Sequence, residues 1–289
     1  MNNIVIIGAG RLGTSLGFTL SKMGFSINGI SCQTQKSAEE SQKIIGDGMA
    51  STDHSFTAKL GNVLFITVPD DAIEKVALNL ARSDVSWGEK YVFHCSGLLP
   101  SEVLSPLKNK GAKTASMHPI QSFHQKTPNP EAFKGIYFGC EGDESALSLA
   151  KNIINKLGSH FLVVPKKEKP SYHVACSMAS NFFVVLLDIA ASLLENIGLE
   201  KKMAFQTLIP LVEGTWRNVK GSSPSASLTG PIVRGDNKSV SLHLDALRKT
   251  TSYHEIYRTL AREALEIAKR EQKIPAEKIA AIEILLGEK

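Results

Sequence analysis

Short apolar segments alternate with helical patterns through the first half of the chain. Strands are predicted at 3–8, 26–31, 62–68, 90–95, 113–117, 135–139 and 160–164. Between them, apolar residues recur at helical spacing, which predicts helices at 11–23, 37–45, 71–82, 100–109 and 143–157. Strands that alternate with helices in this way are typical of βαβ units and a parallel sheet. The first half is therefore predicted to be a doubly wound α/β domain.

From Pro170 onward, long helical periodicities replace this alternation. Helices are predicted at 171–196, 200–219, 239–249, 252–272 and 275–286, and a loop at 221–236 is rich in Gly, Ser and Pro. We therefore expect an all-α domain after the α/β domain. The predicted domains span residues 1–166 and 167–289.

The first apolar run, at residues 4–7, leads into the spacing Gly-x-Gly-x-x-Gly. In such a loop the first glycine permits a tight turn, the second lets a pyrophosphate approach the backbone, and the third lets the helix pack on the sheet. The helix N-terminus then offers free N–H groups to the phosphates. The strand before the motif and the amphipathic helix after it favour a dinucleotide-binding (Rossmann) domain over an ordinary glycine-rich turn. The predicted cofactor-binding residues of this loop are Gly8, Gly10, Arg11, Leu12 and Gly13.

The end of the second predicted strand bears on the choice of cofactor. NAD-binding domains carry an acidic residue there that accepts the ribose hydroxyls, whereas this chain has no Asp or Glu between that strand and Glu39. Ser31, Thr34 and Lys36 can donate to a 2′-phosphate, and Arg11 stands in the glycine loop. These residues favour NADP(H) over NAD. The alternative is an ordinary polar loop that leaves the cofactor open.

The carboxyl ends of the later strands also carry candidate residues, because ligands of open α/β sheets bind beyond these ends. Val68 and Pro69 are expected beside the cofactor, and Ser96 and Gly97 beside the nicotinamide or the substrate. His118 precedes a proline at another strand end, where its imidazole can donate to a substrate carbonyl or carboxylate. The alternative for His118 is a structural histidine that bonds a loop carbonyl.

A file of polar residues runs along the first helix of the second domain. Lys169, His173, Ser177 and Asn181 recur every fourth residue among apolar or small neighbours, so they share one helix face. Buried without partners, such a file would be costly, which indicates a crevice that holds water or ligand. His173 is the predicted proton donor, with Lys169 as its rival, and Ser177, Ser180 and Asn181 would hold the substrate. The alternative is hydrogen bonding between helices at a dimer interface.

A loop pinned by glycine and proline, Leu228–Asp236, has a defined shape and contains Arg234. The guanidinium of Arg234 can hold a substrate carboxylate through two hydrogen bonds. An Arg234–Asp236 contact that stabilises the loop is an equal alternative.

Composition narrows the class of protein. The net charge is +5 over 289 residues, without the basic face of a nucleic-acid-binding protein, so the mild basicity fits an anionic cofactor or small-molecule substrate. The four cysteines lack C-x-x-C spacing, and no metal site is expected. The apolar stretch Phe182–Leu194 contains Asp188 and is too short to span a bilayer. Without a leader sequence, the chain is expected to be cytoplasmic and not membrane-bound.

Five motifs occur in an order that resembles a known bacterial family. They are the glycine loop, His94–Gly97, His118–Phe123, the helix from His173 to Asn181, and Leu228–Asp236. The family joins a Rossmann-like domain to a DUF2520 helical domain and resembles a branch of the 6-phosphogluconate dehydrogenase superfamily. That superfamily includes pyrroline-5-carboxylate and ketopantoate reductases. The resemblance implies an NADP-dependent reductase, and some relatives are thought to act as an alternative ketopantoate reductase in pantothenate synthesis.

Better-known enzymes of that superfamily use a Lys-x-x-x-Asn pair as proton donor and substrate anchor. If Asn181 sets the alignment, His173 stands at the position of that lysine and Ser177 at that of the asparagine. This departure keeps Lys169 as a rival acid. The expected function is NADPH-dependent reduction of a small 2-oxo acid, with ketopantoate as the best single substrate, in a homodimer. The alternatives are an imine reductase of the pyrroline-5-carboxylate type and a non-enzymatic NADP-binding sensor or interaction protein.

Overall fold

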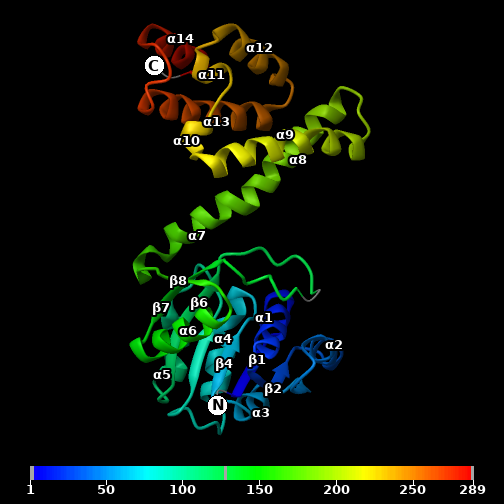
Figure 1. The fold of residues 1–289 in the computed structure, drawn as a ribbon, viewed down its shortest axis with the longest axis vertical. Coiled ribbons are helices and arrows are strands. Elements are labelled where there is room, and N and C mark those ends of the chain that lie inside the picture. The colour runs from blue at the N-terminus through cyan, green and yellow to red at the C-terminus, as the bar shows by residue number, and fades with distance from the viewer. Residues whose placement is uncertain (1–2, 127–128, 288–289) are drawn as a thin grey trace. The chain divides into compact units, whose positions relative to one another are not determined.

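A computed structural model of the chain describes residues 3–126 and 129–287. The chain divides into two compact units, Met1–Phe182 and Phe183–Lys289 (Figure 1). This division falls after the whole polar file, whose last member is Asn181, whereas the sequence places the boundary at 166/167.

The first unit contains one sheet of eight strands in the order β3-β2-β1-β4-β5-β6-β7-β8. The strands are β1 Asn3–Ile7, β2 Ser26–Ser31, β3 Met49–Ser51, β4 Val63–Ile66, β5 Tyr91–His94, β6 Lys113–Pro119, β7 Tyr137–Gly142 and β8 His160–Val163. Neighbours from β3 to β6 pair in parallel. The carboxyl ends of β1, β4, β5 and β6 therefore meet at the same edge of the sheet.

Helices cover both faces of this sheet (Figure 1). The helices of this unit are α1 Arg11–Lys22, α2 Gln35–Ile45, α3 His54–Lys59, α4 Asp70–Ala81, α5 Ser105–Lys108, α6 Glu144–Lys156 and α7 Lys169–Ser177, with 3-10 turns at Ser101–Leu104 and Lys166–Glu168 and a π-helical turn at Met178–Phe182. Successive residues of β1 enter opposite cores: Ile4 and Ile6 pack in one, Val5 and Ile7 in the other. Burial on both faces explains why the strands are continuously apolar. The predicted doubly wound α/β domain is confirmed.

Three features of the first unit differ from the expectation. β7 pairs with β6 in antiparallel fashion, because the described residues between them form no crossover helix and the chain returns through an irregular loop. β3 and α3 were not predicted, because three and six residues are too few to show a period. Asp53 begins α3 by accepting hydrogen bonds from the N–H groups of Ser55 and Phe56.

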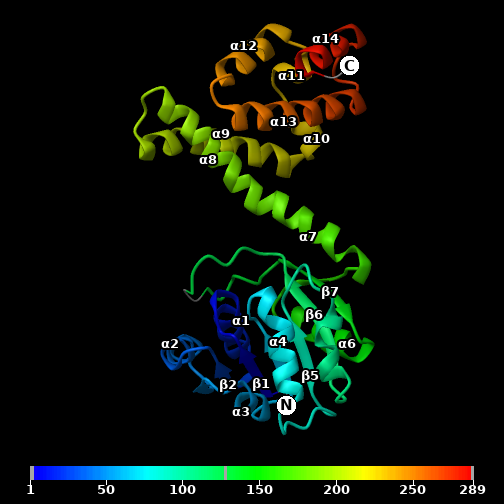
Figure 2. The same cartoon turned by 180° about the vertical axis from the view of Figure 1, so that it is seen from behind.

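The second unit is entirely helical in its described residues, as predicted (Figure 2). Its helices are α8 Phe183–Asn196, α9 Lys201–Gly221, α10 Pro224–Ser227, α11 Pro231–Arg234, α12 Asn237–Leu247, α13 Thr251–Arg270 and α14 Ala276–Leu286. Helices α11 to α14 share a core that includes Val240, Leu265 and Ile282. Helix α8 packs on α9, and Pro210 lies inside α9 without ending it.

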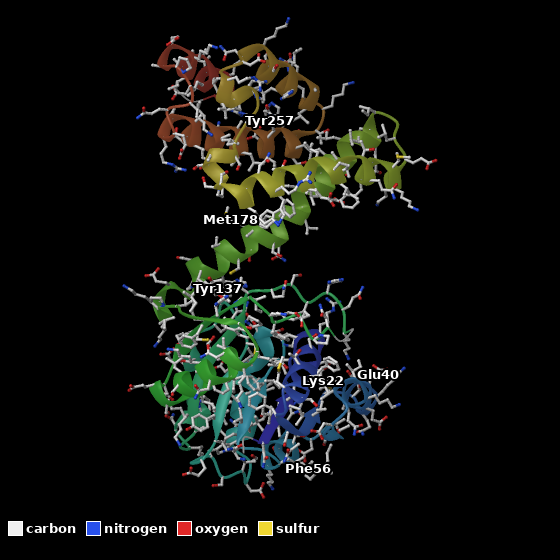
Figure 3. All side chains as sticks on the ribbon, in the orientation of Figure 1. Lys22, Glu40, Phe56, Tyr137, Met178 and Tyr257 are labelled. Atoms are coloured by element: carbon white, nitrogen blue, oxygen red, sulfur yellow. The ribbon has the colours of Figure 1, made fainter. Side chains whose placement is uncertain are left out.

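One helical stretch, residues 166–196, is long and apolar enough to cross a membrane by length and composition, although only 6% of its most apolar window is buried. The stretch Phe182–Leu194 is thus part of a longer helix than the sequence predicted, because the π-helical turn joins α7 to α8 without a break. Met178, labelled in Figure 3, is 61% exposed on this stretch. In a soluble protein, a helix that packs against a partner can be equally long and apolar. The helix alone therefore does not indicate a membrane protein.

Candidate active site

The glycine loop after β1 has the shape of a phosphate cradle. Gly8 has a φ of +86°, and a Cβ there would overlap Val68 Cγ1. A Cβ at Gly13 would overlap Thr67 Oγ1. Because Gly10 stands before α1 without a side-chain cap among the described residues, the first N–H groups of the helix are available to an anion. The loop therefore fits the pyrophosphate of a dinucleotide.

Of the candidate cofactor-binding residues at and after the end of β2, one is buried and the others are exposed. Ser31 is buried, and its Oγ lies 2.8 Å from His54 Nδ1. This differs from the expectation that Ser31 faces a phosphate, because its hydroxyl is already paired inside the fold. Thr34 begins α2 by accepting a hydrogen bond from Ser37 N, while Lys36 and Arg11 are exposed. The structure thus leaves two cations, Arg11 and Lys36, free to meet a 2′-phosphate.

A further cation reaches the start of α2 from a distant segment. Lys126, in the loop between β6 and β7, donates from Nζ to Ser37 Oγ at 3.2 Å. Sequence reasoning missed Lys126 because it belongs to no motif and lies in an irregular loop. Its approach to α2 is a tertiary contact across 89 residues, which no local pattern reveals.

The loop after β5 is fixed by the hydroxyl of Ser96. Ser96 Oγ donates to Asp70 Oδ2 at 2.7 Å and accepts from the N–H groups of Leu98 and Leu99. The side chain is buried and fully engaged, whereas the sequence placed it against the nicotinamide or substrate. Ser96 therefore shapes the loop, and Gly97 is the residue of this motif that meets the predicted catalytic side chains.

Lys169 lies beneath the same loop. It is 1% exposed, and its Nζ donates to Ser96 O at 3.2 Å and to Ser116 Oγ at 2.6 Å. Burial lowers the pKa of Lys169, and the negative charge of Glu141 opposes this shift. The ammonium thus joins α7, the loop after β5 and strand β6. In this position its hydrogen bonds hold the loop after β5, and its ammonium does not face solvent.

Two imidazoles meet above Gly97. A Cβ at Gly97 would lie 2.8 Å from His118 Cε1 and 2.8 Å from His173 Cδ2, and the ring centroids are 6.2 Å apart. Burial, helped by the charges of Lys169 and His173, lowers the pKa of His118 to about 4, so His118 is neutral at pH 7. Its Nδ1 lies 2.6 Å from the hydroxyl of Tyr172, a residue that the every-fourth spacing passed over. The predicted histidines are thus brought together.

The rest of the polar file diverges from them. Ser177 is half-buried at the end of α7, whereas Ser180 and Asn181 are exposed on the π-helical turn. None of the three contacts His118 or Lys169 by a hydrogen bond in the described residues. A π turn shifts the hydrogen-bond spacing to i→i+5, so residues four apart no longer keep one face there.

Arg234 lies in the second unit, at the end of α11, and its side chain is exposed. The carboxylate of Asp236 accepts hydrogen bonds from N and Oγ of Ser239, at 3.1 and 2.7 Å. These hydrogen bonds, with a smaller contribution from the charge of Arg234, lower the pKa of Asp236. Asp236 therefore acts first as the cap of α12, and the guanidinium of Arg234 remains available.

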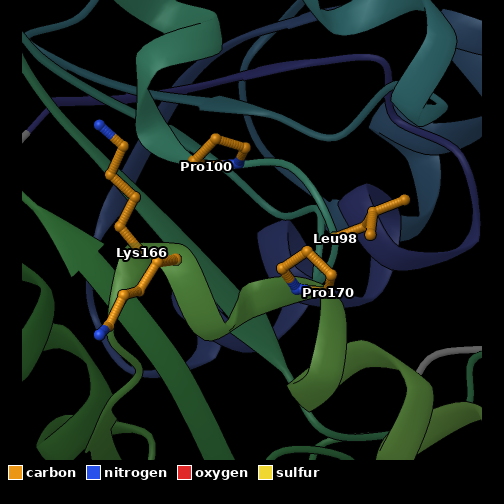
Figure 4. Close-up of a pocket in the computed structure, with 5 residues that line it drawn as sticks. Leu98, Pro100, Lys166 and Pro170 are labelled. Atoms are coloured by element: carbon orange, nitrogen blue, oxygen red, sulfur yellow. The ribbon is translucent and has the colours of Figure 1, made fainter.

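A pocket of about 510 Å³ lies in the first unit, between the loop after β5 and the start of α7 (Figure 4). It is lined by Leu98, Pro100, Lys166, Lys167 and Pro170. These residues adjoin Gly97 and Lys169 in sequence, but none of them belongs to the predicted cofactor or catalytic set. Lys166 forms an ion pair with Glu102. The pocket therefore lies beside the candidate site and contains none of its predicted residues.

Comparison with known proteins agrees with this architecture. A Rossmann-like domain family matches residues 2–119, and a family named domain of unknown function DUF2520 matches residues 136–264. No curated protein matches the chain.

Solved structures with the same fold span nearly the whole chain. One from Bacteroides fragilis, described provisionally as an NADP oxidoreductase, is 25% identical with a TM-score of 0.77 and covers 92% of this chain and 98% of its own. A Thermotoga maritima protein is 28% identical with a TM-score of 0.72, covering 93% and 99%. A reductive aminase from Aspergillus terreus, solved with NADPH and ethyl levulinate, is 14% identical with a TM-score of 0.67, covering 98% and 99%. This last similarity shows the fold alone.

The support given by Lys169 can be tested by Lys169→Met. The substitution leaves the carbonyl of Ser96 and the hydroxyl of Ser116 without their donor, so we expect the free energy of unfolding to fall by about 1–3 kcal/mol. Urea unfolding followed by circular dichroism measures the loss. Lys167→Met removes a lysine whose side chain is 86% exposed and should change stability by less than about 0.5 kcal/mol. Equal losses in the two variants would contradict the supporting role.

Proposed function

Because the chain belongs to the proteins that join a Rossmann-like domain to a DUF2520 domain, we propose that it is an NADPH-dependent reductase of a small 2-oxo acid. The fold and the glycine loop are those of NAD(P)-dependent oxidoreductases. The proposal that the substrate is a small 2-oxo acid rests on the side chains that lie next to Gly97.

The observation that carries the proposal is the meeting of His118 and His173 over Gly97, at the edge of the sheet that also bears the glycine loop. The loop follows β1 and Gly97 follows β5, two strands away in the sheet. At about 4.8 Å per strand this spacing is roughly 10 Å. A dinucleotide held at its pyrophosphate by the loop would extend along this edge toward the imidazoles.

The positions of the two histidines and of Lys169 support a role for each of them. The reduced nicotinamide, when bound, supplies the hydride that the keto carbon receives. His173, half-buried beside Gly97, protonates the carbonyl oxygen, and neutral His118 donates a hydrogen bond to the substrate. Ser177, Ser180, Asn181 and Arg234 are proposed as substrate-binding residues from the sequence pattern alone, because the first three diverge from the histidines and Arg234 belongs to the second unit. Lys169 supports the loop from below and is not the acid.

Replacing His173 by Ala tests the proton transfer. A ketone reductase that loses its general acid is expected to slow by about 10²-fold or more, whereas NADPH binding should persist. The assay follows NADPH oxidation with a panel of 2-oxo acids, ketopantoate among them, and cyclic imines. His160→Ala, an exposed histidine of β8, is the control and should keep its activity.

The panel also separates the alternatives. An imine reductase whose substrate binds already protonated would keep most of its activity in His173→Ala. A protein that binds NADPH but turns over no member of the panel would be an NADP-binding sensor, and the reductase proposal would then be wrong. The comparisons give ketopantoate no special support, so it enters as one member of the panel.

The preference for NADP(H) rests on Arg11 and Lys36, with Lys126 placed nearby by the fold. Lys36→Ala is expected to raise the Kd for NADPH about tenfold, the value of one charge-assisted hydrogen bond, and to leave the Kd for NADH unchanged. Isothermal titration calorimetry measures both. Lys43→Ala, near the other end of α2, is the matched control. A wild-type protein that binds both cofactors equally, or prefers NADH, would contradict the preference.

We also propose that the chain is a cytoplasmic homodimer whose second copy covers the exposed apolar side chains of α8 and α9. Val184 is 62% exposed and Leu211 68% exposed, which is unusual for a monomer. Sedimentation without detergent should show a dimer, and Val184→Asp should dissociate it. Ile284→Asp changes an equally exposed apolar residue, 74% exposed on α14, and should leave the dimer intact. A wild-type monomer, or recovery only from membranes, would refute the proposal.

A further inference from the structure

Tyr172 contacts His118 through a space that a glycine of the sheet leaves open. Its hydroxyl lies 2.6 Å from His118 Nδ1, and the two rings meet edge to face at 90°. Gly139 stands opposite His118 in the pairing of β6 with β7. A Cβ at Gly139 would lie 2.5 Å from the Tyr172 hydroxyl. The missing side chain at Gly139 therefore makes the space in which the hydroxyl reaches the imidazole.

The chemistry of the neighbours decides which atom donates in this hydrogen bond. Burial raises the pKa of Tyr172, so the phenol keeps its proton. The Cys176 thiol also contacts the hydroxyl, and burial raises its pKa as well. A neutral thiol is a weak acceptor, whereas an unprotonated imidazole nitrogen is a good one. The Tyr172 O–H therefore donates to His118 Nδ1.

The other ring nitrogen must then carry the proton, because burial keeps His118 neutral with a pKa of about 4. This Nε2–H lies over Gly97, where a Cβ would be 2.9 Å from it. No other described residue accepts a hydrogen bond from Nε2. The N–H is thus directed to the same spot above Gly97 that His173 borders.

We propose that Tyr172 is a positioning residue that holds His118 as the Nε2–H tautomer, so that His118 binds the substrate oxygen as a neutral donor while His173 supplies the proton. The part of this inference that concerns the substrate rests on the proposed reductase function. The tautomer itself does not, because it depends only on contacts within the first unit. In this arrangement His118 is a fixed hydrogen-bond donor and His173 transfers the proton.

The titratable and charged groups around His118 come from two packed elements. Helix α7 contributes Lys169, His173 and Tyr172, and β5 contributes His94. Burial, together with the charge of Lys169 and a smaller influence of His118, lowers the pKa of His94 to about 3. Lys169 is therefore the fixed positive charge beside both imidazoles, and it favours their neutral forms.

Nitrogen-15 NMR of the full-length protein at pH 7 tests the tautomer directly. In the wild type we expect the His118 signals of an unprotonated Nδ1 and a protonated Nε2. Tyr172→Phe should give a mixture of tautomers, and Gly139→Ala, which displaces the hydroxyl, should do the same. Tyr137→Phe, an exposed tyrosine of β7, should leave the wild-type signals. A proton on Nδ1 in the wild type, or an unchanged tautomer in Tyr172→Phe, would overturn the proposal.

A kinetic measurement separates the positioning role from a merely structural one. In Tyr172→Phe we expect kcat/KM to fall about tenfold, the value of one hydrogen bond, with the Kd for NADPH and the thermal midpoint unchanged. The Tyr172→Phe, His118→Asn double variant should be no slower than His118→Asn alone, because both changes remove the same interaction. Additive losses would refute the coupling. If no substrate is turned over, the reductase proposal fails, while the NMR result still decides the tautomer.

Discussion

The ammonium of Lys169 lies almost completely buried at the start of α7, beside the loop after β5, and the geometry of the site follows from it. Its donors hold the carbonyl of Ser96 and the hydroxyl of Ser116. These bonds fix the loop after β5 relative to β6, and with it the place of Gly97 against His118 and His173. A buried cation is costly unless it is hydrogen-bonded and paired. Glu141 supplies the opposing charge.

Glu141 is itself held, and this makes the arrangement rigid. Its two carboxylate oxygens accept hydrogen bonds from Ser101 N at 2.6 Å and Ser101 Oγ at 2.8 Å. Two groups of hydrogen bonds, Ser101 with Glu141 and Lys169 with Ser96 and Ser116, are therefore linked by the opposite charges of Glu141 and Lys169. Such networks are stable only when every member has a partner. The loop that carries Gly97 is thus fixed before any ligand arrives.

The sequence predicts the fold well because its strong signals are local. The glycine loop, the strands β1, β2, β4, β5 and β6 and the long helices each follow from a run of adjacent residues. The antiparallel return of β7 does not, because it depends on where the chain goes after an irregular loop. The candidate site shows the same limit. His118 and His173 are visible in the sequence, but Tyr172 beside Gly139 and Lys126 beside Ser37 are tertiary contacts. The buried positions of Ser31 and Ser96 likewise depend on partners that no spacing reveals.

The two histidines differ in environment, and this difference assigns their chemistry. His118 is held between the Tyr172 hydroxyl and Gly97, close to a buried positive charge, and a proton added there would be repelled by Lys169. His173 is on the same helix as Lys169 but one turn later and, like His118, it is half-buried. The Tyr172 hydroxyl holds His118, whereas no hydrogen bond holds His173 in the described residues. Burial and the charge of Lys169 discourage charge on His118, so we assign the proton transfer to the imidazole that is not held.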